Sequence, residues 1–236
     1  SLTNSADLVW TLKIAGGQTV ASRSFAASDA FGIGDTNPVL NLEAGDYELI
    51  VSSASGQAGA YAFRLLDLEA VASHQLQVEG EPLLEQKLAR GDQTDVYQFE
   101  ATAGQRYILG GPGDQAVEGS VFWRLLDPNG QQVWTSDVTP SDIESFGVTG
   151  TYTLLVEGRV GRTDPTGYNV YAYTPQDRQI PLALNEQTEG FIDAPGQVNT
   201  YTFTLAEDST LFFDGLLDSN GGNFRWALQH GTDNSY

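Results

Sequence analysis

The side chains of this sequence best suited to binding a metal ion are acidic residues at expected turns. The candidate ligands are Asp92 and Asp95 around one turn, and Asp214 and Asp218 around another. Ca²⁺ takes six to eight oxygen ligands from carboxylates and carbonyls, so calcium is the cofactor that these residues favour. The competing interpretation is turn chemistry, because Asp side chains cap turns without any metal. No stretch has the spacing of an EF-hand loop.

Side chains suited to catalysis are scarce. The chain has no cysteine, which excludes a thiolate nucleophile and a cysteine-based metal site. His74 and His230 are the only histidines, and neither belongs to a convincing nucleophile, base and carboxylate set. Acidic residues lie mostly at turns, which disfavours a pair of carboxylates converging on a glycosidic bond. The sequence therefore predicts that the protein is not an enzyme.

The charge of the chain restricts its partners. Eleven basic and 31 acidic residues give a net charge of −20. Such a field repels nucleic acid phosphates and anionic lipid headgroups. No apolar run approaches the roughly 18 residues of a membrane span. We expect no nucleic acid partner and no membrane insertion, and we expect an extracellular or cell-surface location.

Three stretches of the sequence repeat one another. The matched pairs are Tyr97 and Tyr201 at a step of 104 residues, Trp123 and Trp226 at 103, Trp10 and Trp123 at 113, and Tyr47 and Tyr152 at 105. A unit of this length has the size of a small domain. The matches predict one complete repeat at 80–178 and two partial ones. Residues 1–74 lack the early strands, and residues 180–236 lack the late strands.

Short alternating segments predict the strands that build each repeat. In the complete repeat they are Val96–Glu100, Arg106–Leu109, Ser120–Leu126, Gln132–Thr135, Thr151–Glu157 and Tyr168–Tyr173, with a type I turn at Asp127–Gly130. Around eight strands in about 100 residues indicate an antiparallel jelly-roll β-sandwich whose strands bury one face and expose the other. The fold class is therefore all-β, with tandem sandwich modules. The polar links Ala70–Glu81 and Thr174–Pro181 are expected to be connectors with few packing demands.

Large aromatic residues offer a second kind of site, a platform for a glycan or a protein. Core packing is the commoner role of such residues in sandwiches. Trp123 recurs as Trp10 and Trp226 and is expected to belong to a shared core. Trp134 has no aromatic equivalent in the first stretch, so Trp134, Arg159 and Arg162 form the predicted ligand-binding site.

The ordered motifs of the complete repeat resemble the bacterial pre-peptidase C-terminal domain family. They are Gly91, Asp92, Asp95, Tyr97, Phe99, Ala103-Gly104-Gln105, Asp127–Gly130, Gly150, Tyr152, Leu154, Val156 and Gly167-Tyr168. The resemblance implies a small jelly-roll module with a non-catalytic accessory role in secreted proteins, sometimes with calcium. The third stretch departs from the pattern, because Gln197 and Asn199 stand where Asp residues flank the turn.

The repeat and the resemblance together predict structural or adhesive modules of a large secreted or cell-surface bacterial protein. Their partners would be neighbouring copies of the same repeat. One alternative is an accessory domain that binds a glycan or matrix protein for a secreted hydrolase. Another is a filament subunit, because incomplete sandwiches leave strand edges that a second chain could complete by head-to-tail self-association.

Overall fold

The computed structural model describes residues 7–28, 37–79, 81, 83–110, 121–136, 141–143, 146–159, 162–194, 196–217, 219 and 224–230. Within these residues the regular elements are β-strands and one short 3-10 turn, η1 (Phe25–Ala27), so the all-β prediction is confirmed. The chain divides into two compact units, Ser1–Arg178 with Phe191–Asn199, and Gln179–Gly190 with Thr200–Tyr236. The described residues contain no helix long and apolar enough to cross a membrane.

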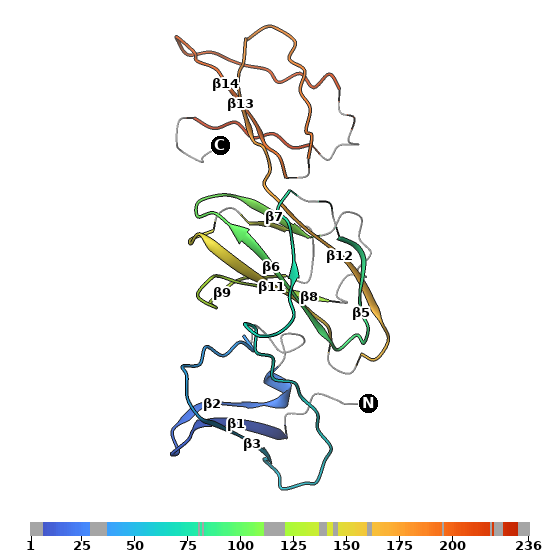
Figure 1. Cartoon of the computed structure of the whole chain (residues 1–236). Helices are drawn as coiled ribbons and strands as arrows, with labels where there is room; N and C mark the ends of the chain where they lie inside the picture. The colour runs from blue at the N-terminus through green and yellow to red at the C-terminus, as the bar shows by residue number, and fades with distance from the viewer. Residues whose placement is uncertain are drawn as a thin grey trace. The chain divides into compact units, whose positions relative to one another are not determined.

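Two sheets in the middle of the chain form a sandwich, here called the middle sandwich (Figure 1). One sheet has the order β4 (His74–Gln75), β6 (Thr94–Ala101), β11 (Gly150–Glu157), β8 (Phe122–Leu126) and β9 (Gln132–Ser136). The other has the order β10 (Ser141–Ile143), β7 (Tyr107–Gly110), β12 (Thr166–Tyr173) and β5 (Leu83–Leu88). These strands confirm the predicted segments to within two residues at each end. Neighbours are antiparallel except β4 and β6, which run parallel.

Aromatic side chains from both sheets fill the space between them. Alternation along β6 and β11 buries Tyr97, Tyr152 and their same-face neighbours, as a period of two residues requires. Phe146 stacks on Tyr152 with ring centroids 4.4 Å apart, and Trp123 meets Tyr168 edge to face at 6.1 Å. Rings of this size bury large apolar areas, so this cluster is the main source of the sandwich's stability.

The opposite face of the β6–β11–β8 region is also buried, which corrects the expectation that each strand would expose one face. Val96, Leu126 and Leu155 form a second apolar cluster on that face. Val39, Leu68 and Val71 pack against this cluster from the preceding part of the chain. This face is buried rather than exposed to solvent because an earlier segment of the chain covers it.

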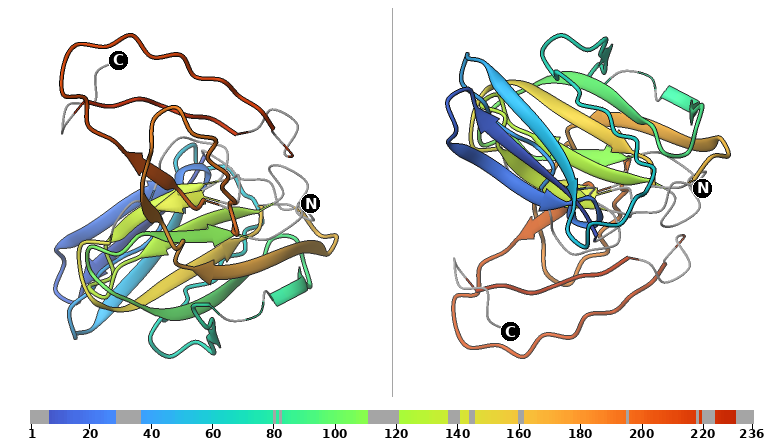
Figure 2. Two further views of the ribbon diagram at one scale, coloured as in Figure 1. Left: turned by 90° about the horizontal axis from the view of Figure 1, so that it is seen from above. Right: turned by 90° about the horizontal axis from the view of Figure 1, so that it is seen from below.

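Residues before the middle sandwich form a three-stranded sheet, here called the N-terminal sheet. Its order is β2 (Thr19–Ser24), β1 (Leu8–Ile14) and β3 (Tyr47–Ser53), and the three strands lie side by side in both views of Figure 2. Trp10 pairs with Val51 in this sheet, and the matched Trp123 pairs with Val156 in the middle sandwich. The order β2-β1-β3 thus corresponds to β9-β8-β11.

Smaller features of the two sheets correspond as well. The register of the outer pair shifts directly after Leu12 in β1 and directly after Leu125 in β8. The Tyr47 hydroxyl donates to the carbonyl oxygen of Glu43 at 2.7 Å. The matched Tyr152 hydroxyl donates to the carbonyl oxygen of Val148 at 2.8 Å. In each case a tyrosine ties the loop before its strand to the strand itself.

The link Ala70–Glu81 packs more closely than the sequence suggested. It contains β4, and Leu76 is buried in the core of the middle sandwich. The Leu76 amide donates to the Gln98 carbonyl oxygen at 2.8 Å, and the Thr174 amide donates to a Glu79 carboxylate oxygen at 2.7 Å. The expectation of few packing demands was wrong, because this stretch supplies a strand to the sheet edge and an apolar side chain to the core.

The last regular elements are β13 (Arg178–Pro181) and β14 (Asn199–Thr202), which form a two-stranded sheet, here called the C-terminal strand pair. The Arg178 amide donates to the Val198 carbonyl oxygen, and the Leu182 amide donates to that of Thr202. An advance of four residues on both strands is the pattern of a parallel pair. It corresponds to β4 and β6, because Tyr201 matches Tyr97.

The prediction that Trp226 shares the core environment of Trp123 was wrong. Trp123 is 1% exposed, whereas Trp226 is 64% exposed and stacks on Phe213 with ring centroids 4.5 Å apart. The physical reason is that the described residues after β14 form no further strands that could cover it.

Candidate functional site

The predicted calcium ligands Asp92 and Asp95 have separate partners. An Asp92 carboxylate oxygen accepts from the Arg90 guanidinium at 2.8 Å, and this hydrogen bond lowers the pKa of Asp92. The Asp95 carboxylate accepts a hydrogen bond from the Tyr168 hydroxyl. Each carboxylate therefore accepts a hydrogen bond from another side chain of the fold. The calcium site stays a prediction.

Of the second predicted pair of calcium ligands, the structure describes one residue. Asp214 is exposed in the segment after β14, and Asp218 lies outside the described residues. In the part of the chain that the structure describes, no three acidic or histidine side chains gather closely enough to hold a metal ion.

The predicted ligand-binding residues lie on different elements. Trp134 lies on β9 opposite Leu125, is half-buried and packs against the core of the middle sandwich. Arg159 and Arg162 lie between β11 and β12, where the Arg159 amide donates to the Gly91 carbonyl oxygen at 2.7 Å. The aliphatic part of Arg162 lies so close to Gly91 that a Cβ there would be 2.7 Å from its Cγ. Trp134 thus packs inward, and the two arginines line a tight turn.

A buried hydrogen-bonded chain of tyrosines joins the two sheets of the middle sandwich. The Tyr97 and Tyr168 hydroxyl oxygens are 2.8 Å apart, and Tyr168 also donates to Asp95. Burial is the main cause that raises the pKa of both tyrosines above its ordinary value, more strongly for Tyr168. Both hydroxyls therefore keep their protons and bridge β6 to β12 at neutral pH.

These tyrosines set an alkaline limit to stability. Their pKa is higher in the folded than in the unfolded chain, so the contribution of these two tyrosines to the unfolding free energy is constant below pH ~10 and falls as the pH rises further. Tyr168→Phe should make that fall shallower in urea denaturation measured across this pH range. Tyr61→Phe, at an exposed tyrosine, is the matched control and should leave the slope unchanged. An unchanged slope in Tyr168→Phe would contradict this assignment.

A buried ion pair lies on the outer face of the β8–β11 pair. Arg124 and Glu157 are 2% and 5% exposed, and the Arg124 Nε donates to Glu157 Oε1 at 2.6 Å. Arg124 also donates to the Gln132 side chain and lies over the Phe122 ring at 5.4 Å. Several bonds to one guanidinium compensate for its removal from water. Sequence reasoning missed this pair, although two charged residues within expected strands were a visible signal.

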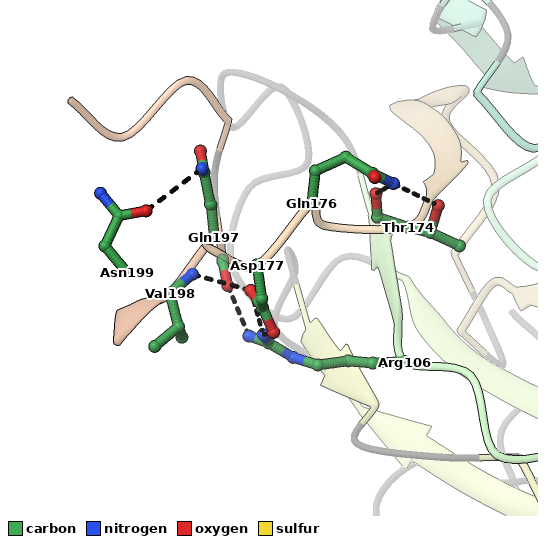
Figure 3. A network of polar contacts seen from close by, with 8 residues as sticks. Arg106, Thr174, Gln176, Asp177, Gln197, Val198 and Asn199 are labelled. Carbon is green, nitrogen blue, oxygen red and sulfur yellow. Dashed lines mark hydrogen bonds and ion pairs between the residues drawn. The ribbon is translucent and has the colours of Figure 1, made fainter. Parts of the chain in front are cut away.

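A polar network at the start of β7, formed by Arg106, Asp177, Gly196 and Val198, is here called the edge clamp (Figure 3). The Arg106 guanidinium donates to an Asp177 carboxylate oxygen at 2.9 Å and also to the Gly196 carbonyl oxygen. Asp177 in turn accepts from the Val198 amide at 2.8 Å. Gly196 has a φ of +76°, and a Cβ there would lie 2.6 Å from the Ile108 side chain. Only glycine fits this approach without strain.

The edge clamp continues into the turn before β14. Gln197 is buried, and its side-chain oxygen accepts from the Asp193 amide at 2.7 Å. The main-chain amide of Gln197 donates to the Ala194 carbonyl oxygen at 3.2 Å. The main-chain amide of Gln93 donates to the Arg90 carbonyl oxygen in the same way, at 3.0 Å. Gln197 thus orders the turn before β14 through its side chain and its main chain.

Comparison with known proteins gives limited similarity. No protein-family model matches the chain, and no curated protein matches it. Among solved structures, the pre-peptidase C-terminal domain of collagenase from Bacillus anthracis matches at 19% identity and a TM-score of 0.32, covering 43% of this chain and 94% of that one. PliG, a periplasmic inhibitor of g-type lysozyme, matches from Aeromonas hydrophila at 15% and 0.30, covering 43% and 96%. The Salmonella Typhimurium PliG matches at 17% and 0.28, covering 43% and 98%. At this level they carry no argument about function.

Proposed function

We propose that this chain is a stretch of a tandem array of β-sandwich modules with a structural, non-catalytic role in a secreted or cell-surface bacterial protein. The correspondence between the N-terminal sheet and the middle sandwich carries the proposal. Both have the same strand order, the same Trp-to-Val pairing and the same register shift. Unrelated sheets have no reason to share all three, whereas duplicated sequences do.

The polar side chains support a structural role. Several acidic residues are engaged in ion pairs or hydrogen bonds, among them Asp92 with Arg90, Asp95 with Tyr168, Glu157 with Arg124, Asp177 with Arg106 and Asp193 with Arg178. A carboxylate held in this way stabilises a turn or a strand pair. A catalytic carboxylate would instead face a substrate.

Contacts on the middle sandwich join it to the sequence that precedes it and to the sequence that follows it. On one side, Val39, Leu68 and Val71 cover its outer face, and the Asn41 side chain donates to the Gly130 carbonyl oxygen at 3.2 Å. At the start of β7, the edge clamp holds Gly196 and Val198. A spacer needs such contacts, because free linkers between modules would let it collapse.

Hydrogen exchange tests the proposal at the edge clamp. In the unaltered chain, amides of residues 196–199 should exchange slowly, and Arg106→Ala should speed their exchange because Asp177 and Gly196 lose their donor. Arg90→Ala removes another arginine–aspartate pair and is the matched control, with no expected effect at 196–199. Fast exchange of these amides in the unaltered chain would contradict a restrained array.

A further inference from the structure

The segment that leads into the middle sandwich, residues 73–79, bonds to both of its sheets and is here called the entry segment. Its strand β4 runs parallel to β6, with His74 opposite Tyr97. Further along, Val78 forms a parallel bridge to Ala172 near the end of β12. Because β6 and β12 belong to different sheets, the entry segment joins the two layers to each other.

Glu79 ties the entry segment to the end of β12. The Glu79 amide donates to the Ala172 carbonyl oxygen at 3.0 Å. A Glu79 carboxylate oxygen accepts from the Thr174 amide at 2.7 Å and also from the Thr174 hydroxyl. Glu79 has a φ of 63°, which residues other than glycine seldom adopt. Backbone strain of this kind persists where surrounding bonds hold it, and it gathers at functional contacts.

Gln98 of β6 makes the other contact with the entry segment. Its carbonyl oxygen accepts from the Leu76 amide at 2.8 Å. Its side-chain oxygen accepts from the Ser73 hydroxyl at 2.9 Å and from the Gln75 side chain at 3.4 Å. The Leu76 side chain is buried in the core. Withdrawing the entry segment therefore breaks several hydrogen bonds and exposes an apolar side chain.

We propose that the middle sandwich carries tension along the chain, and that the entry segment and the end of β12 form the contact that resists it. The inference rests on the tandem array proposed above, in which each module is pulled through its neighbours. Tension draws the entry segment back toward its N-terminal side, and it draws Thr174 and the residues after it forward. Because the two segments run parallel, these pulls are opposite in direction along one axis.

The parallel arrangement decides how the bonds fail. Hydrogen bonds run between strands rather than along them, so opposite pulls along the strand direction load all the bonds together. If the two segments were antiparallel, both would leave the contact at the same end, and tension would open the bonds one after another. β4 and β6 are parallel as well, so the bonds to Gln98 are also loaded together.

Single-molecule stretching of the full chain tests the proposal, because the chain has no cysteine and accepts handles at chosen sites. Ala72→Cys and Gln176→Cys place handles at exposed residues on the two sides of the contact. The sandwich should open in one step with a contour length of about 340–370 Å, because about 104 residues extend by about 3.3–3.6 Å each. An earlier short step that releases the entry segment alone would overturn the proposal.

Glu79→Ala removes the acceptor of two of the three bonds at the end of β12. Forced unfolding is governed by the unfolding rate, and each bond to a charged acceptor is equivalent to about a factor of ten or more. With these handles the variant should therefore unfold at least about tenfold faster at a given force. No acceleration would overturn the proposal.

The matched control variant is Asp127→Ala. The Asp127 carboxylate also accepts two hydrogen bonds, from the Asn129 and Gln131 amides, both at 2.8 Å. It lies in the turn between β8 and β9, and β9 is at the opposite edge of the sheet from β4. This turn is still intact when the entry segment yields, so the rate under tension should be unchanged.

A second pulling direction separates resistance to tension from general stability. Handles at Ala103→Cys and Thr163→Cys lie in connections between strands, so force enters without passing through the entry segment. Glu79→Ala should have little effect in this direction. Equal acceleration in both directions would overturn the proposal, because it would show that Glu79 stabilises the whole sandwich. The hydrogen exchange expected at residues 196–199 does not depend on Glu79, so the array itself is tested separately.

Discussion

Replacing Arg124 with methionine should lower the unfolding free energy by about 3–5 kcal/mol, because Glu157 is then left buried without its cation. The cost comes from burying the Glu157 charge without that of Arg124, so removing the carboxylate should recover most of the loss. The double variant Arg124→Met/Glu157→Leu is therefore expected to be close to the unaltered chain. Urea denaturation followed by tryptophan fluorescence measures all three.

The matched control for these Arg124 and Glu157 variants is a solvent-exposed ion pair. Arg178 and Asp193 form a comparable contact, but their side chains are 48% and 49% exposed. Arg178→Met should change the unfolding free energy by less than about 1 kcal/mol. A double variant as unstable as Arg124→Met alone would show that packing around the guanidinium, and not the charge of Glu157, causes the loss.

Trp123→Ala should be the most damaging single truncation in the middle sandwich, at about 3–5 kcal/mol. The side chain is enclosed by both sheets and meets the Tyr168 ring, so its removal leaves a cavity. Trp226→Ala is the natural comparison, because the two tryptophans match in sequence and differ in burial. It should cost less than about 1 kcal/mol in the monomeric chain. Equal losses at the two positions would contradict the exposed placement of Trp226.

The sequence repeat predicted much of the strand framework because matched residues keep matched partners. Trp10 and Trp123 each lie opposite a valine on the neighbouring strand. This pairing follows from the alternation of each strand and from its register with its neighbour. Burial was harder to foresee. The run of Leu154, Leu155 and Val156 breaks the alternation of apolar and polar residues. Leu155 faces away from the core between the sheets and is covered by residues more than 80 positions earlier in the chain. A local pattern contains no information on such distant cover.

Candidate sites were less predictable than strands. Asp92 and Asp95, which could ligate calcium, accept hydrogen bonds from an arginine and from a buried tyrosine hydroxyl, and composition does not separate these roles. Asp95 illustrates the point, because its partner Tyr168 lies 73 residues away on the other sheet. The edge clamp was missed for a similar reason. Arg106 and Asp177 are 71 residues apart, and no pattern in the sequence indicates that they contact each other.

The place of β4 has a consequence for grafting this module into other proteins. Leu76 belongs to the core and β4 closes the sheet edge beside β6, so a boundary drawn at residue 80 removes part of the fold. The matching strand β13 begins at Arg178. A transplantable unit therefore runs from His74 to Asp177, and its length equals the 104-residue step between Tyr97 and Tyr201. Recombination at these two points would exchange whole sandwiches and leave no orphaned strand behind.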